Sequence, residues 1–447
     1  MPPTPPALPP PTADPLAPVT PVAAVAAATP VAAVTPRAGP GFYGWHIVWA
    51  VFFISSTCSG LSVYALSVYL HAILADGRFS MTEASFASGT FTIAMGVAGL
   101  GVGRLLVTRD IRRVMAAGAV LMAAALMAIP LIDALWKLVI FYAVLGIGYG
   151  SVALIPCTTL ITRWFVARRS TAMSIGATGN SFGAVAITPF IALLIAQIGL
   201  DLASRWLALL MLIGTLPLIA WVLVAYPRER GLAALGERPA TGDSNGAAHA
   251  KGTAHVYRSR FFITGTLAFA LGMAAHVGGQ THLFNRVMTA SGDTSLASLS
   301  IALMAASSVG ARFLVVYALR RMSSRAMIVA LLAIQGVALI ACGLFDSRAA
   351  LLVAITVYGG TLGSFITMQA LLVAEAFGVA HYAQIYAMAR FLSVLGVLIG
   401  PGLMGLLHQR TGGYLASFMA VGLISMLGAL VLAAAGPTPV PGEARSE

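Results

Sequence analysis

The chain has 447 residues, of which 59% are hydrophobic and only 9% charged. Soluble globular domains carry about 25% charged residues, so this composition excludes a soluble enzyme, a secreted disulfide scaffold and a fibrous protein. Apolar runs of about 20 residues, each long enough to cross roughly 30 Å of hydrocarbon, recur along the chain. The sequence therefore indicates a polytopic membrane protein, for which we expect no enzymatic activity and no cofactor.

The net charge of +12 is not a nucleic-acid signal. Of the 26 basic residues, 24 are Arg, and most lie in short loops between apolar runs rather than on one polar face. Basic residues in such loops mark the cytoplasmic side of a membrane protein. The charge therefore indicates membrane topology, with the lipid bilayer as partner and no nucleic acid.

The predicted elements begin after an N-terminal tail, residues 1–42, which is too rich in Pro for a stable helix and is expected to be disordered. Two sets of six membrane-spanning helices follow. The first set lies within residues 43–226 and is predicted at Trp45–Leu70, Ala84–Val107, Val114–Ile132, Leu138–Ile161, Thr171–Ile198 and Trp206–Tyr226. The second set lies within residues 261–436 and is predicted at Phe261–Thr289, Ser295–Ala318, Met327–Phe345, Ala350–Ala374, Ala383–Leu407 and Tyr414–Ala435. A polar linker at residues 227–260 joins the sets, and a short tail at 437–447 ends the chain.

The basic residues also predict the orientation. With a cytoplasmic N-terminus, the cytoplasmic segments hold 17 Lys and Arg residues and the opposite segments hold five. This asymmetry predicts twelve crossings of a plasma or inner membrane with both termini in the cytoplasm.

A weak repeat relates the two sets of helices. The second span ends in Gly103-Arg104 and the eighth in Gly310-Ala311-Arg312, and each is followed by a basic cluster. The offset is about 207 residues and predicts a parallel repeat of two six-helix halves. Glycines at 146, 148, 150, 176, 179 and 183 lie in the fourth and fifth spans. They predict either sliding surfaces between the halves or close packing within one half.

Two six-helix halves, a central linker and basic turns after the second and eighth spans resemble the major facilitator superfamily. The resemblance covers residues 43–436 and implies an all-α membrane protein of twelve helices in two pseudo-symmetric halves. In the turn after the second span, Val107 occupies the place of the superfamily's usual acid and Asp110 the place of its usual Gly.

Three local stretches are similar to the monocarboxylate transporter and oxalate–formate antiporter group. They are Tyr43-Gly44-Trp45, Trp164-Phe165-x-x-Arg168-Arg169, and Gly400-Pro401 followed by Thr411-Gly412-Gly413-Tyr414. The resemblance implies a substrate-binding Arg on the eighth helix and a basic residue on the eleventh. It does not carry over proton coupling of the animal type. Tyr64 stands where animal members have a lysine, and Ser308 stands where they have an Asp before Arg312.

Charged residues inside apolar spans are the main candidates for a binding site, because each costs at least about 2.5–3.5 kcal/mol to insert. Arg312 lies eight residues before Arg320, or about 12 Å along a helix, and its guanidinium can bind a carboxylate through two hydrogen bonds. The alternative is a structural Arg that binds backbone carbonyls, as Arg104 could at the equivalent place. Arg390, with Tyr386 one turn away, has the same two interpretations, and Tyr64 is a further candidate for substrate binding.

The seventh span carries an unusual polar cluster. His276 and Gln280 share one face, and His282 and Asn285 share another. Gln280 and His282 are candidates for hydrogen bonds to a substrate, and His282 also for proton relay; the alternative for His282 is a hydrogen-bonded residue near the outer mouth. Arg286 is expected to extend to the outer lipid headgroups. No carboxylate or thiol joins the histidines, so no metal site is predicted.

No Asp or Glu falls within a predicted span, so the charge inside the membrane is positive. A positive interior favours an anionic substrate. Glu375, at the end of the tenth span, is expected to pair with a basic turn. The sequence contains no phosphate-binding loop, which argues against direct use of ATP.

These features predict a monomeric secondary transporter of a small organic anion, a mono- or dicarboxylate, that works by alternating access. The site is expected near the midplane between the halves. A coupling proton and a counter-anion both remain open as partners. The alternatives are efflux of a neutral amphiphilic compound and, from another class, a non-transporting membrane sensor on the same fold.

Overall fold

The computed structural model describes residues 41–75, 79, 81–236, 254–379 and 381–439. Most of the predicted N-terminal tail, the middle of the linker and the end of the C-terminal tail lie outside these residues. The first set of helices comprises α1 (Gly44–Leu61), α2 (Leu66–Ala75), α3 (Met81–Thr108), α4 (Ile111–Met127), α5 (Leu135–Val152), α6 (Leu154–Trp164), α7 (Arg169–Phe182) and α8 (Thr188–Pro217). After α9 (Ala254–Arg258), the second set comprises α10 (Arg260–Ser291), α11 (Thr294–Ala318), α12 (Ser324–Leu344), α13 (Arg348–Phe377), α14 (Tyr382–Thr411) and α15 (Tyr414–Ala433).

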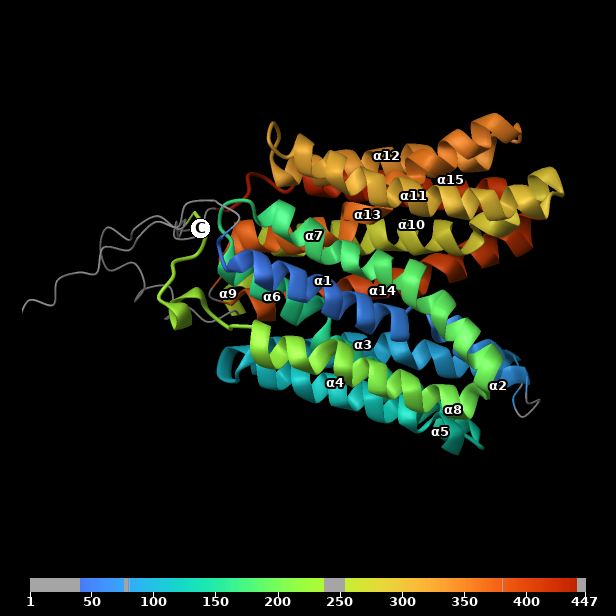
Figure 1. Cartoon of the computed structure of the whole chain (residues 1–447). Helices are drawn as coiled ribbons and strands as arrows, with labels where there is room; N and C mark the ends of the chain where they lie inside the picture. Colours follow the sequence, from blue (N-terminus) through green and yellow to red (C-terminus); the bar gives the residue numbers. More distant parts are fainter. Residues whose placement is uncertain (1–40, 76–78, 80, 237–253, 380, 440–447) are drawn as a thin grey trace, which may run out of the picture. The chain divides into compact units, whose positions relative to one another are not determined.

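The helices form twelve membrane crossings, as predicted. Ten helical segments of the described chain are long and apolar enough to cross a membrane. One of them, Arg169–Val222, has 54 residues, which at 1.5 Å per residue is more than twice the thickness of a hydrocarbon core. It reverses direction at Gly199, where φ is 77°, as Figure 1 shows at α7 and α8. It therefore makes two crossings, and α4, with 17 residues, supplies the twelfth.

Two crossings are broken near their middle. The first is interrupted between α1 and α2, where Ser62 leaves the helical region with φ −126° and ψ −87°. The fourth is interrupted at Ala153 between α5 and α6. Pro156 has no N–H for the carbonyl of Val152, and the thiol of Cys157 donates to that carbonyl instead, at 3.4 Å. The break is thus satisfied by a neighbouring side chain.

Glycine contacts reveal the repeat between the two sets. A Cβ at Gly146 or Gly150 of α5 would meet the α3 carbonyls of Phe91 or Met95. In the second set, a Cβ at Gly359 or Gly363 of α13 would meet the α11 carbonyls of Met304 or Ser308. Each position is related to its counterpart by 213 residues, for example Gly146 to Gly359 and Met95 to Ser308. The same helix pair therefore packs in the same way in both sets.

The glycines of the fifth crossing show whether these residues pack within one set or slide between the sets. Positions 176, 179 and 183 pack against α1, where a Cβ would meet Val51, the carbonyl of Phe52 and the carbonyl of Ser56 in turn. In the second set, Gly396 and Gly400 of α14 make the matching contacts with the carbonyls of Ala270 and Ala274 of α10. These glycines serve close packing within one set rather than sliding between sets.

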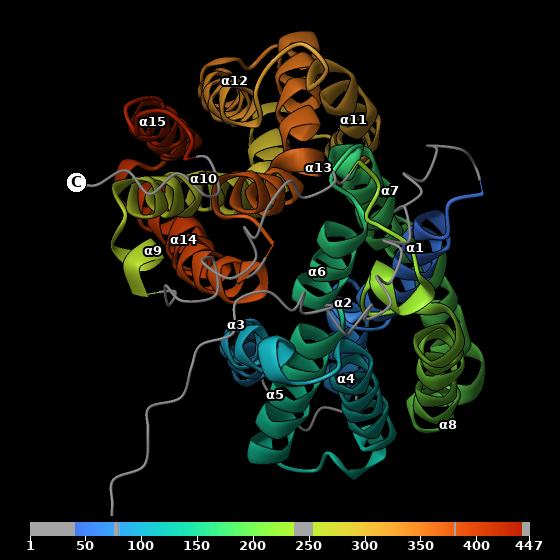
Figure 2. The ribbon, with the colours of Figure 1, turned by 90° about the vertical axis from the view of Figure 1, so that its left-hand side faces the viewer.

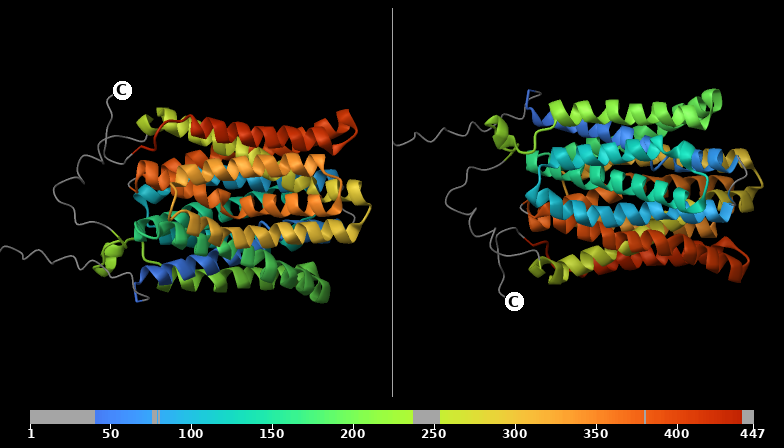
Figure 3. Two further views of the ribbon diagram at one scale, coloured as in Figure 1. Left: turned by 90° about the horizontal axis from the view of Figure 1, so that it is seen from above. Right: turned by 90° about the horizontal axis from the view of Figure 1, so that it is seen from below.

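The two sets lie beside each other in the unit formed by residues 35–447. Viewed along the helices, α1–α8 gather on one side and α10–α15 on the other (Figure 2). The contacts between the sets are made by α3 with α14, by α6 with α14, and by α7 with α11 and α13. The helices run side by side, and both described ends of the chain lie at the same end of the bundle, with residues 227–236 (Figure 3). We call this the basic end, because the loops after α3, α6 and α11 carry their Arg residues there.

The start of the linker is tied to the first set. Leu235 accepts hydrogen bonds from the backbone N–H groups of Val166 and Ala167 at 3.0 and 2.7 Å, and it donates to the carbonyl of Trp164 at 2.9 Å. The guanidinium of Arg230 lies over the ring of Tyr43, 3.8 Å from its centre. Residues 227–236 are therefore part of the structured first set.

Candidate functional site

The two helical sets are in close contact toward the basic end. A Cβ at Gly103 of α3 would meet Ala387 and the carbonyl of Ala383 on α14. Further along the same pair of helices, a Cβ at Gly96 would lie 3.4 Å from the ring of Phe391. The guanidinium of Arg169 in the first set also lies within electrostatic range of the Glu375 carboxylate in the second set. Glu375 also accepts a hydrogen bond from Ser324 at 2.9 Å.

Toward the opposite end the sets separate. On the face of α14 that contacts α3, Val394 is 5% exposed, whereas Leu398, one turn further on, is 50% exposed. On α7 and its continuation, Val185 is 76% exposed, although it lies only one turn beyond Ser181, which contacts the second set. A cleft therefore opens between the sets at the end away from the basic loops.

Arg312 and Tyr64 form the first of two polar clusters, at the contact between α7 and α11. The break between α1 and α2 places Tyr64 where its hydroxyl interacts electrostatically with the guanidinium of Arg312. Arg312 is only 9% exposed. Its Nη1 donates to the carbonyl of Ala177 at 2.7 Å, and its Nη2 donates to the hydroxyl of Ser181 at 3.1 Å. In this conformation the first set of helices therefore already binds the Arg312 guanidinium.

Neutral polar residues of the first set continue this cluster. Ser59 donates to the side-chain oxygen of Asn180 at 2.7 Å and lies 3.2 Å from the hydroxyl of Tyr149. A cavity of about 30 Å³ lies between α1, α6, α7 and α13, next to these residues. Its polar lining includes Ser55, Cys157, Thr158, Asn180 and Thr367. The volume is enough for one or two water molecules.

The second cluster lies in the second set, around Arg390 of α14. The Nε and Nη1 atoms of Arg390 are buried and have no hydrogen-bond partner in the described part of the chain. The hydroxyl of Tyr386 and the Nδ1 of His276 are likewise buried and unpartnered there. Both of these groups interact electrostatically with Arg390, and the ring of His276 stacks on Phe365 with 6.1 Å between ring centres. The cluster thus holds a guanidinium with free donors and two adjacent groups with free polar atoms.

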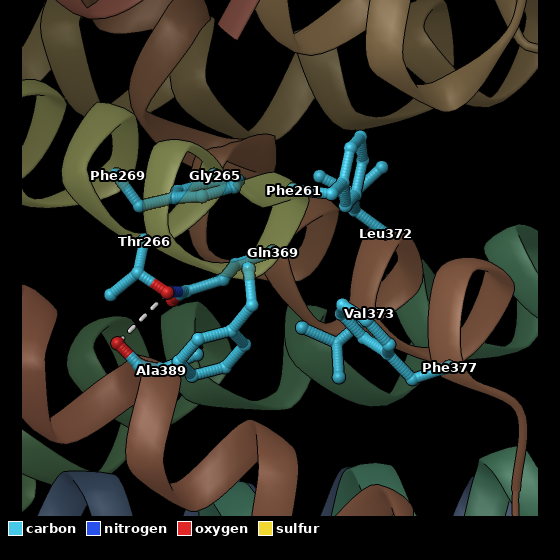
Figure 4. A pocket seen from close by; sticks show the side chains of 10 residues that line it. Phe261, Gly265, Thr266, Phe269, Gln369, Leu372, Val373, Phe377 and Ala389 are labelled. Atoms are coloured by element: carbon cyan, nitrogen blue, oxygen red, sulfur yellow. Dashed lines mark hydrogen bonds between the residues drawn. The ribbon is translucent and has the colours of Figure 1, made fainter. Parts of the chain in front are cut away.

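The second set also contains a smaller cavity of about 20 Å³, between α10, α13 and α14 (Figure 4). It is lined mainly by aromatic and aliphatic side chains, including Phe261, Phe269 and Phe377. Gln369 enters it and donates to the carbonyl of Ala389 and the hydroxyl of Ser393 at 3.3 and 2.8 Å. A volume of this size has room for about one water molecule, so the cavity as it stands does not accommodate a substrate.

The other predicted site residues on α10 lie apart from these clusters. Gln280 is exposed, one turn beyond His276. The Nε2 of His282 lies 3.2 Å from the carbonyl of Pro401, and its ring packs against Tyr414. Six residues separate His276 from His282, or about 9 Å along the helix and roughly 240° around it. The structure thus brings Tyr64 together with Arg312, and Tyr386 together with Arg390, while His282 contacts α14 and α15.

Two sequence-based expectations about arginines are wrong. Arg286 does not extend to the headgroups. It is 5% exposed, donates to the carbonyls of Cys342, Gly343 and Phe345, and pairs with Asp346 at 2.7 Å. Arg104 is exposed and is not equivalent to Arg312. The 213-residue register seen in the glycine contacts aligns Arg312 with Gly99. The offset of about 207 is misleading because the two basic clusters follow their helices at positions that are not equivalent.

Sequence reasoning missed His276 as a neighbour of Arg390, and Ala177 and Ser181 as partners of Arg312. The polar pair Asn180-Ser181 within an apolar span was the available signal for α7. The sequence contained no signal for Ala177, because its backbone carbonyl binds Arg312 and every residue has a backbone carbonyl.

The fold, with its twelve crossings and a cleft between two repeated helical sets, is that of a multi-pass membrane transporter. The family model of the Major Facilitator Superfamily matches residues 52–345, more than half of the chain. The chain therefore belongs to the Major Facilitator Superfamily.

Comparisons with curated proteins and solved structures agree. Monocarboxylate transporter 11 of Mus musculus is 25% identical over 410 residues, covering 88% of each chain. Its Homo sapiens counterpart is 27% identical over 413 residues, covering 88% of this chain and 83% of that protein. The proton:xylose symporter XylE superposes with a TM-score of 0.69 at 14% identity, over 87% of this chain and 94% of that one. The E. coli fucose:proton symporter FucP gives 0.64 at 14% identity, over 88% and 98%.

Proposed function

We propose that the protein is a secondary transporter of a small organic anion, a mono- or dicarboxylate, and that Arg390 binds the carboxylate. The observation that carries this proposal is the pair of buried donors on Arg390 that have no partner in the described residues. A buried polar group without a hydrogen bond is costly, and a buried charge more so. A carboxylate at either edge of the guanidinium would accept a hydrogen bond from one of these two atoms and a parallel one from Nη2.

The surroundings of Arg390 support an anion rather than a cation. The described residues place no carboxylate within ion-pair distance of Arg390 or Arg312, so no described residue compensates the positive charge in this region. Tyr386 and His276 offer further polar atoms beside Arg390. Two nitrogens of Arg312 are bound to α7, and only its Nε lacks a partner among the described residues, so Arg390 is the better candidate for the first contact with the substrate. The name of the monocarboxylate transporter relatives points to the same substrate class.

The transport cycle follows from the repeat. Two sets of helices that meet at the basic end and separate at the other can exchange these contacts by rocking around a site between them. We propose that the basic end faces the cytoplasm, in accordance with the distribution of Arg. The coupling partner is a proton or a counter-anion.

The test is uptake by the purified protein in liposomes. Labelled mono- and dicarboxylates would be presented with no gradient, with an imposed proton gradient, and with each carboxylate preloaded inside. Accumulation of at least one carboxylate in protein-containing but not empty liposomes is expected, and the gradient that drives it identifies the coupling partner. If only neutral amphiphilic compounds are moved, the efflux alternative replaces this proposal.

A further inference from the structure

Both hydrogen bonds of Arg312 cross from the second helical set to the first. The residue belongs to α11, and its partners, Ala177 and Ser181, lie one turn apart on α7. Within its own set, the residue one turn earlier is Ser308, which offers no negative charge. Among the described residues, both hydrogen-bond acceptors of Arg312 therefore lie in the other set.

The position of these bonds coincides with the place where the cleft ends. Beyond Ser181, the π-helical segment Gly183–Ile187 that follows α7 is exposed at Val185. Before Ser181, in the direction of the basic end, lies the 30 Å³ cavity, which Ala177 helps to line. Arg312 thus stands between the open cleft and a closed cavity.

The lining of this cavity makes it sensitive to the separation of the sets. Val51, Ser55, Cys157 and Asn180 all come from the first set, whereas Thr367 of α13 comes from the second. If the sets moved apart at the basic end, Thr367 would be withdrawn and the cavity would become accessible. Cys157, which is 4% exposed, is a native reporter of that event.

The other contact between the sets is built differently. In the 213-residue register, Gly99 of α3 stands where α11 has Arg312. The α3–α14 contact is formed instead by small residues, with Gly103 against Ala383 and Ala387. The contact of α3 with α14 is therefore apolar and closely packed, whereas the contacts of α7 with α11 and α13 include charged side chains, Arg312 and the Arg169–Glu375 pair.

We propose that Arg312 is a positioning residue that latches the two sets together, and that breaking its bonds to Ala177 and Ser181 opens the cavity at Cys157 to the basic end. The inference concerns the opening step and does not depend on the substrate. A bond from a charged donor shifts an equilibrium by roughly ten- to hundredfold, which is large enough to decide which state is populated.

The experiment uses the full-length protein with Cys157 as the remaining cysteine, Cys58 and Cys342 being replaced by Ser. A membrane-impermeant thiol reagent is applied to membrane vesicles from either side, without substrate. A separate cysteine at Arg321, in the loop after α11, identifies the side that the basic end faces. Arg312→Gln should accelerate labelling of Cys157 from that side about tenfold or more, and Ser181→Ala should accelerate it less, in the same direction.

A matched control excludes general loosening of the fold. In the variant that keeps only Cys342, a fully buried residue of the second set, Arg312→Gln should leave labelling unchanged. The proposal is overturned if labelling of Cys157 is unaffected in both variants, if it rises only from the opposite side, or if Cys342 is accelerated equally. Binding of carboxylates to Arg390 variants is measured separately, so its failure would affect the proposed function and not the latch.

Discussion

At the residue scale, arginines in this protein differ by what surrounds the guanidinium. Arg286 donates hydrogen bonds to three backbone carbonyls at the end of α12 and to the carboxylate of Asp346. Helix C-termini leave carbonyls unbonded, and a cation there also interacts favourably with the helix dipole. Arg390 has two buried donors without a hydrogen-bond partner among the described residues. The first arrangement serves stability, and the second leaves capacity for a ligand.

Replacing Arg286 by Ala is expected to destabilise the protein by about 1.5–3 kcal/mol or more, because hydrogen bonds to a charged group are lost and the buried carbonyls are left without a hydrogen-bond donor. Thermal unfolding in detergent measures the effect. Arg348→Ala is the control, since Arg348 is exposed at the same end of the bundle. Equal unfolding temperatures for the two variants would show that Arg286 has no capping role.

Asp110 provides a pH-dependent contribution outside the membrane. It caps α4 by accepting a hydrogen bond from the backbone N–H of Arg112 at 2.8 Å, and it pairs with the Arg112 side chain at 2.8 Å. Hydrogen bonds from Arg112 hold the pKa of Asp110 below its usual value. Because the folded-state pKa is lowered, the stabilisation is complete above the unfolded pKa of about 3.9 and is lost as the pH falls through the folded value.

Asp110→Asn is therefore expected to cost about 0.2–1 kcal/mol at neutral pH, the range for a partly exposed pair. The difference from wild type should stay constant from pH 7 to about pH 5 and shrink only below about pH 4. Unfolding temperatures across this range provide the measurement. A difference that already disappears near pH 6 would point to another titrating group.

At the element scale, the spans were predictable and the contacts between them were not. An apolar run of about 20 residues is explained by a helix that crosses the hydrocarbon core. For that reason all twelve crossings could be located from the sequence. The break at Ser62–Ala65 and the 213-residue register depend on which faces meet, and a run of apolar residues does not record that. Likewise, the depth of Arg390 could be read from the sequence. Its lack of a partner among the described residues, and the partners of Arg286 that lie 56 to 60 residues away in the chain, could not.

The contact between α1 and α7 gives a test at this scale. A Cβ at Gly179 would overlap the carbonyl of Phe52, which belongs to a helix backbone and cannot move alone. Gly179→Ala is expected to destabilise the protein by about 1–3 kcal/mol through overpacking. Gly101→Ala on α3, where nothing lies within 4 Å of the added Cβ, should be neutral or slightly stabilising. Unfolding in detergent compares them, and equal behaviour would contradict the close packing.

At the scale of the whole molecule, the two helical sets differ in charge although they share their packing. The polar residues that the first set contributes to the cluster around Arg312, such as Ser59, Tyr149 and Asn180, are neutral, whereas the second set contributes Arg312 and Arg390. Packing positions are occupied by glycines in both sets, because helix approach requires them in both. An anionic substrate between the sets would thus find the positively charged side chains of both clusters on the second set.

The orientation can be tested on the same scale. Single cysteines at Arg321, at the basic end, and at Ser347, in the exposed loop before α13, should differ in labelling by an impermeant reagent on intact cells. The distribution of Arg predicts that only position 347 reacts. Reaction at position 321 alone would invert the proposed orientation and with it the direction in which the cleft opens.

Binding of a panel of mono- and dicarboxylates to the purified protein, followed by thermal stabilisation, tests the central claim most directly. At least one carboxylate should stabilise the wild type. Arg390→Lys, which keeps the charge but loses the planar pair of donors, should bind it roughly ten- to hundredfold more weakly. Arg104→Lys, at an exposed site, should bind as the wild type does. A folded Arg390→Lys variant with wild-type affinity would contradict the claim that Arg390 holds the anion.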